Sequence, residues 1–135
     1  TGRYFWGKGP EVAGDFANGA DIAAATLIGM EEKDAFPVRD AWPVTAPIGK
    51  RSPNAFGLWD TIGNAAEWVS DRFGSYPSDS VKDPTGPEKG SQIARGGSFA
   101  EGPLRCRAAF RQGLSDGRHP TVGFRVVATK PIEKR

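Results

Sequence analysis

The sequence has 135 residues, of which 38% are hydrophobic and 25% charged, as is typical of one soluble globular domain with a buried core. Its 18 glycines and 11 prolines argue against a helical bundle and predict many turns between short elements. The net charge of +2 without a basic run gives no reason to expect a nucleic-acid or membrane partner, and no apolar stretch approaches the roughly 20 residues of a transmembrane helix.

The sequence of the N-terminal half predicts little regular structure. Residues 1–11 place aromatic side chains among glycines, which favours a short strand or a packed loop. Residues 18–36 are the one stretch with helical content, although the spacing of their apolar residues is irregular. Residues 37–57 contain four prolines and predict an extended or irregular segment on the surface.

The C-terminal half predicts short strands separated by loops. Residues 64–74 are expected to begin as a strand or a helical turn, and residues 75–92 form a surface loop rich in Pro, Gly, Ser and Asp. Residues 93–102 predict a strand, a glycine break and a second strand. No buried parallel sheet is expected from this pattern.

Alternation of side chains predicts a further strand over residues 104–112, with Leu104, Cys106 and Ala108 on one face. Residues 115–121 then predict a turn, and residues 122–129 a closing strand.

The single cysteine, Cys106, excludes a disulfide within this sequence. It fits a reducing compartment without requiring one, so the composition leaves the cytoplasm and the periplasm open. Because the sequence opens at Thr1 rather than at a methionine, we expect it to be a piece of a longer protein.

The segment GLWDTIGNAAEW, residues 57–68, has the composition of a loop that could enclose a hard cation. Asp60 and Glu67 supply carboxylates at its two ends, and Gly63 allows the backbone to turn so that carbonyl groups point inward. Calcium takes six to eight such oxygen ligands in proteins. The alternative is that the two carboxylates pair with arginines in a packed loop.

Three motifs give this sequence a family resemblance: PNAFGLWDTIGNAAEWVSD (53–71), DPTGPEKGSQIARGGSF (83–99) and CRAAFRQGLSDGRHPTVGFRVV (106–127). In order and spacing they resemble the signatures of the formylglycine-generating, sulfatase-modifying family, and the resemblance runs from about Tyr4 to Ala128. It implies a modified C-type-lectin-like α+β fold with short strands, long irregular loops and little helix.

The resemblance covers only part of the family's usual domain, which is about twice as long. We therefore expect residues 1–135 to be a single domain that corresponds to the C-terminal portion of the family domain. The upstream half, in the same protein or in a companion chain, is the partner that the resemblance implies.

The resemblance also implies structural calcium, at two sets of residues. In the first, the ligands would be the Asn18 side chain, the Gly19 carbonyl, the Asp40 carboxylate and the Trp42 carbonyl. In the second, they would be the Asp60 and Glu67 carboxylates and the carbonyls of Gly63 and Ala65. The alternatives are that Asn18 is a turn residue and that Asp40 caps a helix or forms a salt bridge near Arg39.

Copper is the cofactor of the family's oxidases, which hold copper(I) with two cysteines a few residues after the RGGS motif. Soft thiolates suit copper(I), and oxygen or amine ligands do not replace them well. The corresponding positions here fall near Glu101 and Pro103, while Cys106 lies beyond the second one and is interpreted as a small buried strand residue. Ala66 also replaces a tryptophan usual in the family. We therefore expect no copper site and no copper-dependent formylglycine formation.

Other members of the broad family suggest what the scaffold could do instead. Some resemble ergothioneine sulfoxide synthases, whose iron needs three histidines, whereas this sequence has only His119, interpreted as an exposed turn residue. Others resemble a periplasmic pyoverdine-maturation enzyme, and others are binding or sensor modules. We predict a module that binds an unknown small molecule or protein; the alternative is a non-copper oxidoreductase that uses residues upstream of this chain.

Arginines within the closing motifs need partners or ligands. Arg95 and Arg125 are interpreted as structural, with Glu67, Asp71 and Asp83 as available partners. The residues expected to face a ligand are Ser98, Glu101, Arg107 and Arg111.

Overall fold

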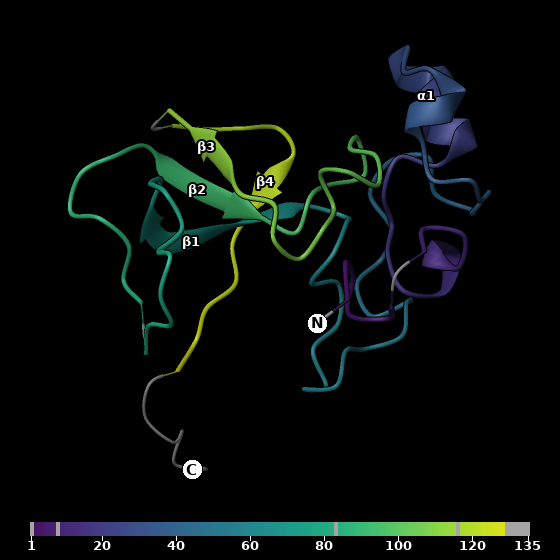
Figure 1. Ribbon diagram of the computed structural model, residues 1–135. Helices are drawn as coiled ribbons and strands as arrows, with labels where there is room; N and C mark the ends of the chain where they lie inside the picture. The colour runs from purple at the N-terminus through teal and green to yellow at the C-terminus, as the bar shows by residue number, and fades with distance from the viewer. Residues whose placement is uncertain (1, 8, 83, 116, 129–135) are drawn as a thin grey trace, which may run out of the picture.

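The computed structural model describes residues 2–7, 9–82, 84–115 and 117–128. A small sheet lies on one side of the molecule, and short helices and loops lie on the other (Figure 1). Short strands, long loops and little helix confirm the predicted α+β class. Within these ranges, no helix is long and apolar enough to cross a membrane.

The α-helix α1, Ile22–Ile28, confirms the helical content predicted for residues 18–36. Its N-cap is Asp21, whose side chain accepts a hydrogen bond of 2.7 Å from the Ala24 N–H, and its C-cap is Gly29 at a φ of 72°. Only Ala24 and Ala25 of the helix are buried, which explains the irregular apolar spacing of its sequence.

Two 3₁₀ helices flank this helix along the chain. The first, η1, spans Ala13–Asp15, and the second, η2, spans Glu32–Asp34. The segment 37–57 contains neither helix nor strand, as its prolines predict.

In the described part of the chain, the sheet has four strands in the order β3-β2-β1-β4. Their bounds are Ala66–Arg72 (β1), Gln92–Arg95 (β2), Gln112–Leu114 (β3) and Val122–Gly123 (β4). Neighbours β1 and β2 are antiparallel with Glu67 opposite Arg95, and β2 and β3 are antiparallel as well. The short β4 runs parallel to β1, so the sheet is mixed.

Three strand predictions for the C-terminal half were wrong in part. Residues 104–110 form tight turns, because the N–H groups of Arg105 and Cys106 both donate to the Gly102 carbonyl rather than to a neighbouring strand. The predicted second strand within 93–102 is also a turn. The closing strand is paired only over Val122–Gly123, and Thr129 lies outside the described residues.

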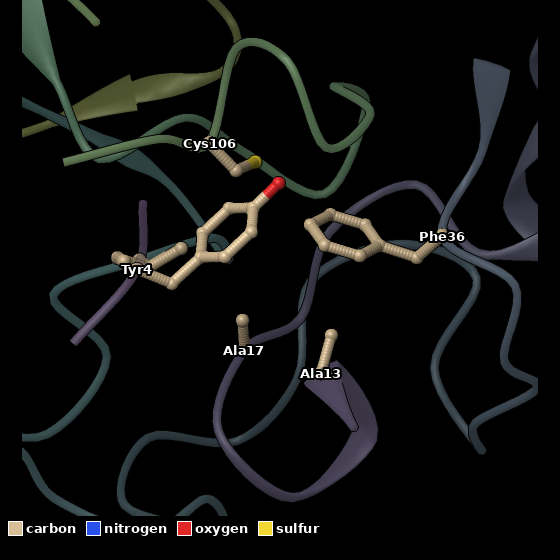
Figure 2. Packing of buried hydrophobic residues seen from close by; sticks show 6 residues of the cluster. Tyr4, Ala13, Ala17, Phe36 and Cys106 are labelled. Atoms are coloured by element: carbon tan, nitrogen blue, oxygen red, sulfur yellow. The ribbon is translucent and has the colours of Figure 1, made fainter. Parts of the chain in front are cut away.

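The core lies beside the sheet and consists of small residues around two aromatic rings. Its buried members are Tyr4, Ala13, Ala17, Phe36, Ile62 and Cys106, and Trp6 and Val38 pack against them. Figure 2 shows the Tyr4 hydroxyl pointing toward Cys106, with the Phe36 ring beside it. The Tyr4 ring also stacks on Trp6 with 4.7 Å between ring centroids, so residues 2–7 form the packed loop that was one of the two alternatives.

Candidate functional site

The turn that follows β2, residues 95–106, is called here the RGGS turn. Gly96 and Gly97 have φ angles of 89° and 71°, which side-chain-bearing residues rarely adopt. A Cβ on Gly97 would lie 2.5 Å from the Cys106 sulfur, and one on Gly96 would lie 2.8 Å from the Thr61 carbonyl oxygen. Both glycines are therefore needed for the chain to reverse direction against the core.

The main chain of Glu101 is held by three partners. Its N–H donates to the Ser98 carbonyl at 3.0 Å. Its carbonyl accepts from the Ala20 N–H at 3.0 Å and from the Cys106 thiol at 3.3 Å. The side chain of Glu101 therefore starts from a fixed backbone position.

Cys106 is completely buried in the core, on the inner side of the RGGS turn. Burial, and to a smaller extent the negative charge of Glu101, raise the pKa of the Cys106 thiol well above its usual range. The thiol is therefore protonated at neutral pH, whereas the thiolate is the form that acts as a nucleophile and as a metal ligand. The burial of the thiol and its hydrogen bond to the Glu101 carbonyl support the interpretation of Cys106 as a structural residue.

A surface cavity of about 970 Å³ opens between η2 and the RGGS turn, and we call it the Glu101 cavity. Its apolar walls include Pro10, Met30, Ala35, Pro37, Ala100 and Leu104. Its polar lining includes Glu32, Lys33, Asp34, Ser98, Glu101, Arg105, His119 and Thr121. The cavity is large enough for a drug-sized ligand.

The carboxylate of Glu101 has only part of its charge and hydrogen-bonding capacity satisfied by other groups in this cavity. The Arg105 guanidinium lies 3.7 Å from Oε1, beyond hydrogen-bond distance, and its side chain is 59% exposed. Oε2 is buried and has no hydrogen-bond partner among the described residues. The Glu101 side chain as a whole is 12% exposed. One oxygen of this desolvated carboxylate therefore lacks a hydrogen-bond donor among the described residues.

The four residues predicted to face a ligand lie at three different places in the structure. Ser98 and Glu101 both line the Glu101 cavity, although Ser98 is fully buried. Arg107 lines a second cavity of about 470 Å³, together with Arg95. Arg111 stacks on the Tyr76 ring at 3.6 Å and donates to the Gly74 carbonyl.

The first predicted calcium set fits a cation poorly. Oδ2 of Asp40 is engaged by the buried Arg51 guanidinium, and Oδ1 accepts from the Trp42 N–H at 2.7 Å. Asn18 does have a buried side-chain oxygen that finds no hydrogen-bond partner in the described ranges. However, its amide nitrogen donates to Val44 and to Asn64, not to Asp40. Asp40 thus forms a salt bridge, but with Arg51 rather than near Arg39.

The second predicted calcium set fits better, since Asp60, Ala65 and Glu67 line one cavity of about 680 Å³. Arg125 donates to both Glu67 oxygens, at distances of 2.6 to 3.1 Å. Its hydrogen bonds to Glu67 raise the pKa of Arg125, with smaller contributions from the charges of Glu67 and Asp60. The paired side chains are partly exposed, so calcium would compete with Arg125 for Glu67 rather than replace a buried ion pair.

Two further residues have structural roles near the predicted calcium sets, and the sequence did not identify either of them. They are Arg51, which engages Asp40, and Asn64, which lines the same cavity as Asp60 and Glu67. Asn64 has a φ of 62°, and its side chain bonds both backbone groups of Ala46, accepting from the N–H at 2.9 Å and donating to the carbonyl at 3.2 Å. The preference of asparagine for positive φ, next to Gly63, is a signal that could have found it. Nothing in the sequence around Arg51 marks its burial.

Comparison with known proteins agrees with the motifs. Residues 1–130 match the family described as sulfatase-modifying factor enzyme 1-like domain. The chain is 38% identical over 88 residues to the formylglycine-generating enzyme of Streptomyces coelicolor, an alignment that covers 60% of this chain and 28% of that protein. The chain spans between 28% and 45% of the length of the curated relatives that it matches.

Two solved structures share the fold. The variable protein 1 of Treponema denticola superposes with a TM-score of 0.62 at 26% identity, covering 82% of this chain and 34% of that one. PvdO from Pseudomonas aeruginosa superposes with a TM-score of 0.58 at 27% identity, covering 82% and 38%.

Proposed function

Because the chain belongs to the sulfatase-modifying factor enzyme 1-like domain family, we propose that it is a ligand-binding module of that family, with the Glu101 cavity as its binding site. The observation that carries this proposal is the position of the RGGS turn. The turn forms one wall of the cavity, while its only thiol lies in the core and does not line the cavity.

The donor chemistry of the chain supports binding rather than copper-dependent oxidation. The sequence has one cysteine, and burial holds that thiol in its protonated form. Copper(I) favours soft thiolate ligands, which this chain would have to supply from a single desolvated group. Glu101, a residue with a carboxylate side chain, lines the cavity instead.

Calcium is proposed as a stabilising ion at the second set only. Asp60 and Glu67 would provide its carboxylate ligands, and Gly63 and Ala65 would add carbonyl oxygens, with water completing the six to eight ligands that calcium takes. The ion would stabilise the fold because it binds the native state only. We do not extend the proposal to the first set, because Arg51 already engages Asp40.

The rest of the family domain, in the same polypeptide or in a companion chain, is the partner that we propose for the segment after β4. Phe124, Val126 and Val127 are 77%, 83% and 81% exposed there. An exposed row of large apolar side chains is typical of a surface that packs against another segment. The chain covers only 28% of one longer relative and 34% of one solved structure, which supports the same partner.

A non-copper oxidoreductase is the second candidate, because the curated relative described above is an enzyme by name. In that case, residues outside this chain would have to hold the redox cofactor. A ligand that binds the Glu101 cavity and is chemically unchanged after incubation of the full-length protein with oxygen would favour the binding module.

The binding site is tested by nuclear magnetic resonance titration of the ¹⁵N-labelled chain with three probes that share a phenylpropyl body: 3-phenylpropylamine, 3-phenylpropan-1-ol and 3-phenylpropionate. We expect at least one probe to shift the amide signals of residues 98–105 with a Kd in the millimolar range, as is usual for about ten heavy atoms. A variant with Ala100→Trp should fill the cavity and abolish the shifts while keeping a dispersed spectrum. If no probe shifts these signals in the unmodified chain, the proposed site is wrong.

A further inference from the structure

Building on the proposed ligand-binding function, we propose that the Glu101 cavity selects an organic cation: a primary amine or a guanidinium group carried on an apolar body. The cation would pair with the Glu101 carboxylate, and the apolar body would lie against the surrounding walls of the cavity.

The first argument is the unpartnered carboxylate oxygen. Oε2 of Glu101 is buried without a hydrogen-bond partner among the described residues, and a buried carboxylate oxygen that is left unpaired is costly. Arg105, 3.7 Å from Oε1, does not satisfy this oxygen. An ammonium or guanidinium N–H would supply the missing donor together with the opposite charge.

The second argument is the balance of charge around the cavity. Glu32 and Asp34 add two acidic side chains to Glu101, against the cations of Lys33 and Arg105. Lys33 forms an exposed pair with Glu31 at 2.6 Å, so its charge is partly balanced outside the cavity. The lining is therefore favourable to a positive ligand.

The third argument concerns the kind of cation. Among the described residues, no three His, Cys, Asp or Glu side chains come close enough together to hold a metal ion. The walls around Glu101 are instead formed by apolar side chains such as Met30, Pro37 and Leu104. One carboxylate in an apolar cavity suits an organic cation with an apolar body better than a hydrated metal ion.

The fixed backbone of Glu101 makes this recognition efficient. Ser98, Ala20 and the Cys106 thiol hold its main chain from three directions. Gly102 adjoins it, and a Cβ there would lie 1.9 Å from the Asp34 carbonyl, so the turn packs directly on η2. A carboxylate placed in advance loses little freedom when a ligand binds.

The test compares the same three phenylpropyl probes at pH 7 and constant ionic strength. We expect 3-phenylpropylamine to bind about tenfold more tightly than 3-phenylpropan-1-ol, the difference that a hydrogen bond to a charged group typically gives. The propionate should bind most weakly. In Glu101→Gln the preference for the amine should disappear, while the alcohol should bind as before. The matched control is Glu88→Gln, which removes an exposed carboxylate that lines none of the three cavities and should leave all three affinities unchanged.

The outcomes separate this inference from the function on which it rests. If the alcohol binds as well as the amine, or if Glu101→Gln keeps the preference, the cation selectivity is wrong and the binding site stands. If the propionate binds most tightly, the selectivity is likewise overturned. If none of the probes shifts the signals of residues 98–105, both proposals fall.

Discussion

The thiol of Cys106 donates to the main-chain carbonyl of Glu101, with 3.3 Å between sulfur and oxygen. This contact joins the buried core to the wall of the Glu101 cavity. The one cysteine of the sequence thus acts as a small buried donor that positions a carboxylate. The predictions below test this arrangement and the contacts that hold the loops around it.

Cys106 should be unreactive toward thiol reagents in the folded chain. Its complete burial hides the sulfur, and its raised pKa keeps it protonated. We expect modification by an aromatic disulfide reagent at pH 8 to proceed only as fast as the chain opens, and rapidly in urea. Fast modification under native conditions would show that the thiol is accessible.

The same pKa shift predicts how stability depends on pH. The unfolded chain loses the thiol proton above the ordinary pKa of 9.0, while the folded chain keeps it. The unfolded state then binds fewer protons, so the free energy of unfolding falls as pH rises, by up to about 1.4 kcal/mol per pH unit. This contribution is fully present below pH 9.0 and is lost above it. Urea unfolding between pH 8 and 10.5 should show a shallower decline in Cys106→Ala, and equal slopes would contradict the assignment.

Asn64 should stabilise the fold through both its side chain and its backbone conformation. Asn64→Gly keeps the freedom to adopt a φ of 62° but loses both bonds to Ala46. We expect it to lower the free energy of unfolding by about 1–3 kcal/mol. Asn64→Ala should cost about 1 kcal/mol more, because alanine is strained at positive φ. If alanine proves no worse than glycine in urea unfolding, the positive φ is not a constraint.

Arg51 and Asp40 should be strongly coupled. Both side chains are more than nine-tenths buried, and Arg51 also donates to the Gly14 carbonyl. Arg51→Met should lower the free energy of unfolding by about 3–5 kcal/mol, since it leaves the Asp40 carboxylate buried without its cation. Combining it with Asp40→Asn should cost less than the sum of the two single changes. Strict additivity in a double-mutant cycle would contradict the pairing.

Calcium should raise the melting temperature, and a chelator should lower it again. In Arg125→Gln the effect of calcium should increase, because Glu67 loses its competing partner. Glu67→Gln should abolish the effect, whereas Asp40→Asn, in the first set, should leave the calcium-dependent shift unchanged. If calcium fails to shift the melting temperature of the unmodified chain and of Arg125→Gln, the second set does not bind the ion.

Local signals in the sequence predicted the parts of the fold that depend on local chemistry. Helical content was predicted within residues 18–36, and α1 lies there, although its caps, Asp21 and Gly29, were not identified from the sequence. The two glycines of the RGGS turn marked the end of β2, where the backbone needs positive φ. The family motifs correctly indicated an α+β fold with long loops.

The remaining features depend on contacts between distant residues. Residues 104–110 alternate like a strand, yet no strand of the described part of the chain pairs with them, and they close into turns on Gly102. Glu101 and Arg107 lie only six positions apart in the sequence, but the intervening turn places them in different cavities. The sequence named Glu67 as one of several available partners for Arg125, but because the two residues lie 58 positions apart, only the closed sheet selects this pair.

The most direct measurement is a competition for copper(I) between the chain and a chromophoric copper(I) chelator under anaerobic, reducing conditions, with Cys106→Ala as the matched control. Because the lone thiol is buried and protonated, the unmodified chain should withdraw no more copper(I) than the variant does. Withdrawal of one copper ion per chain, or per pair of chains, that disappears in Cys106→Ala would show that the scaffold retains a thiolate copper site.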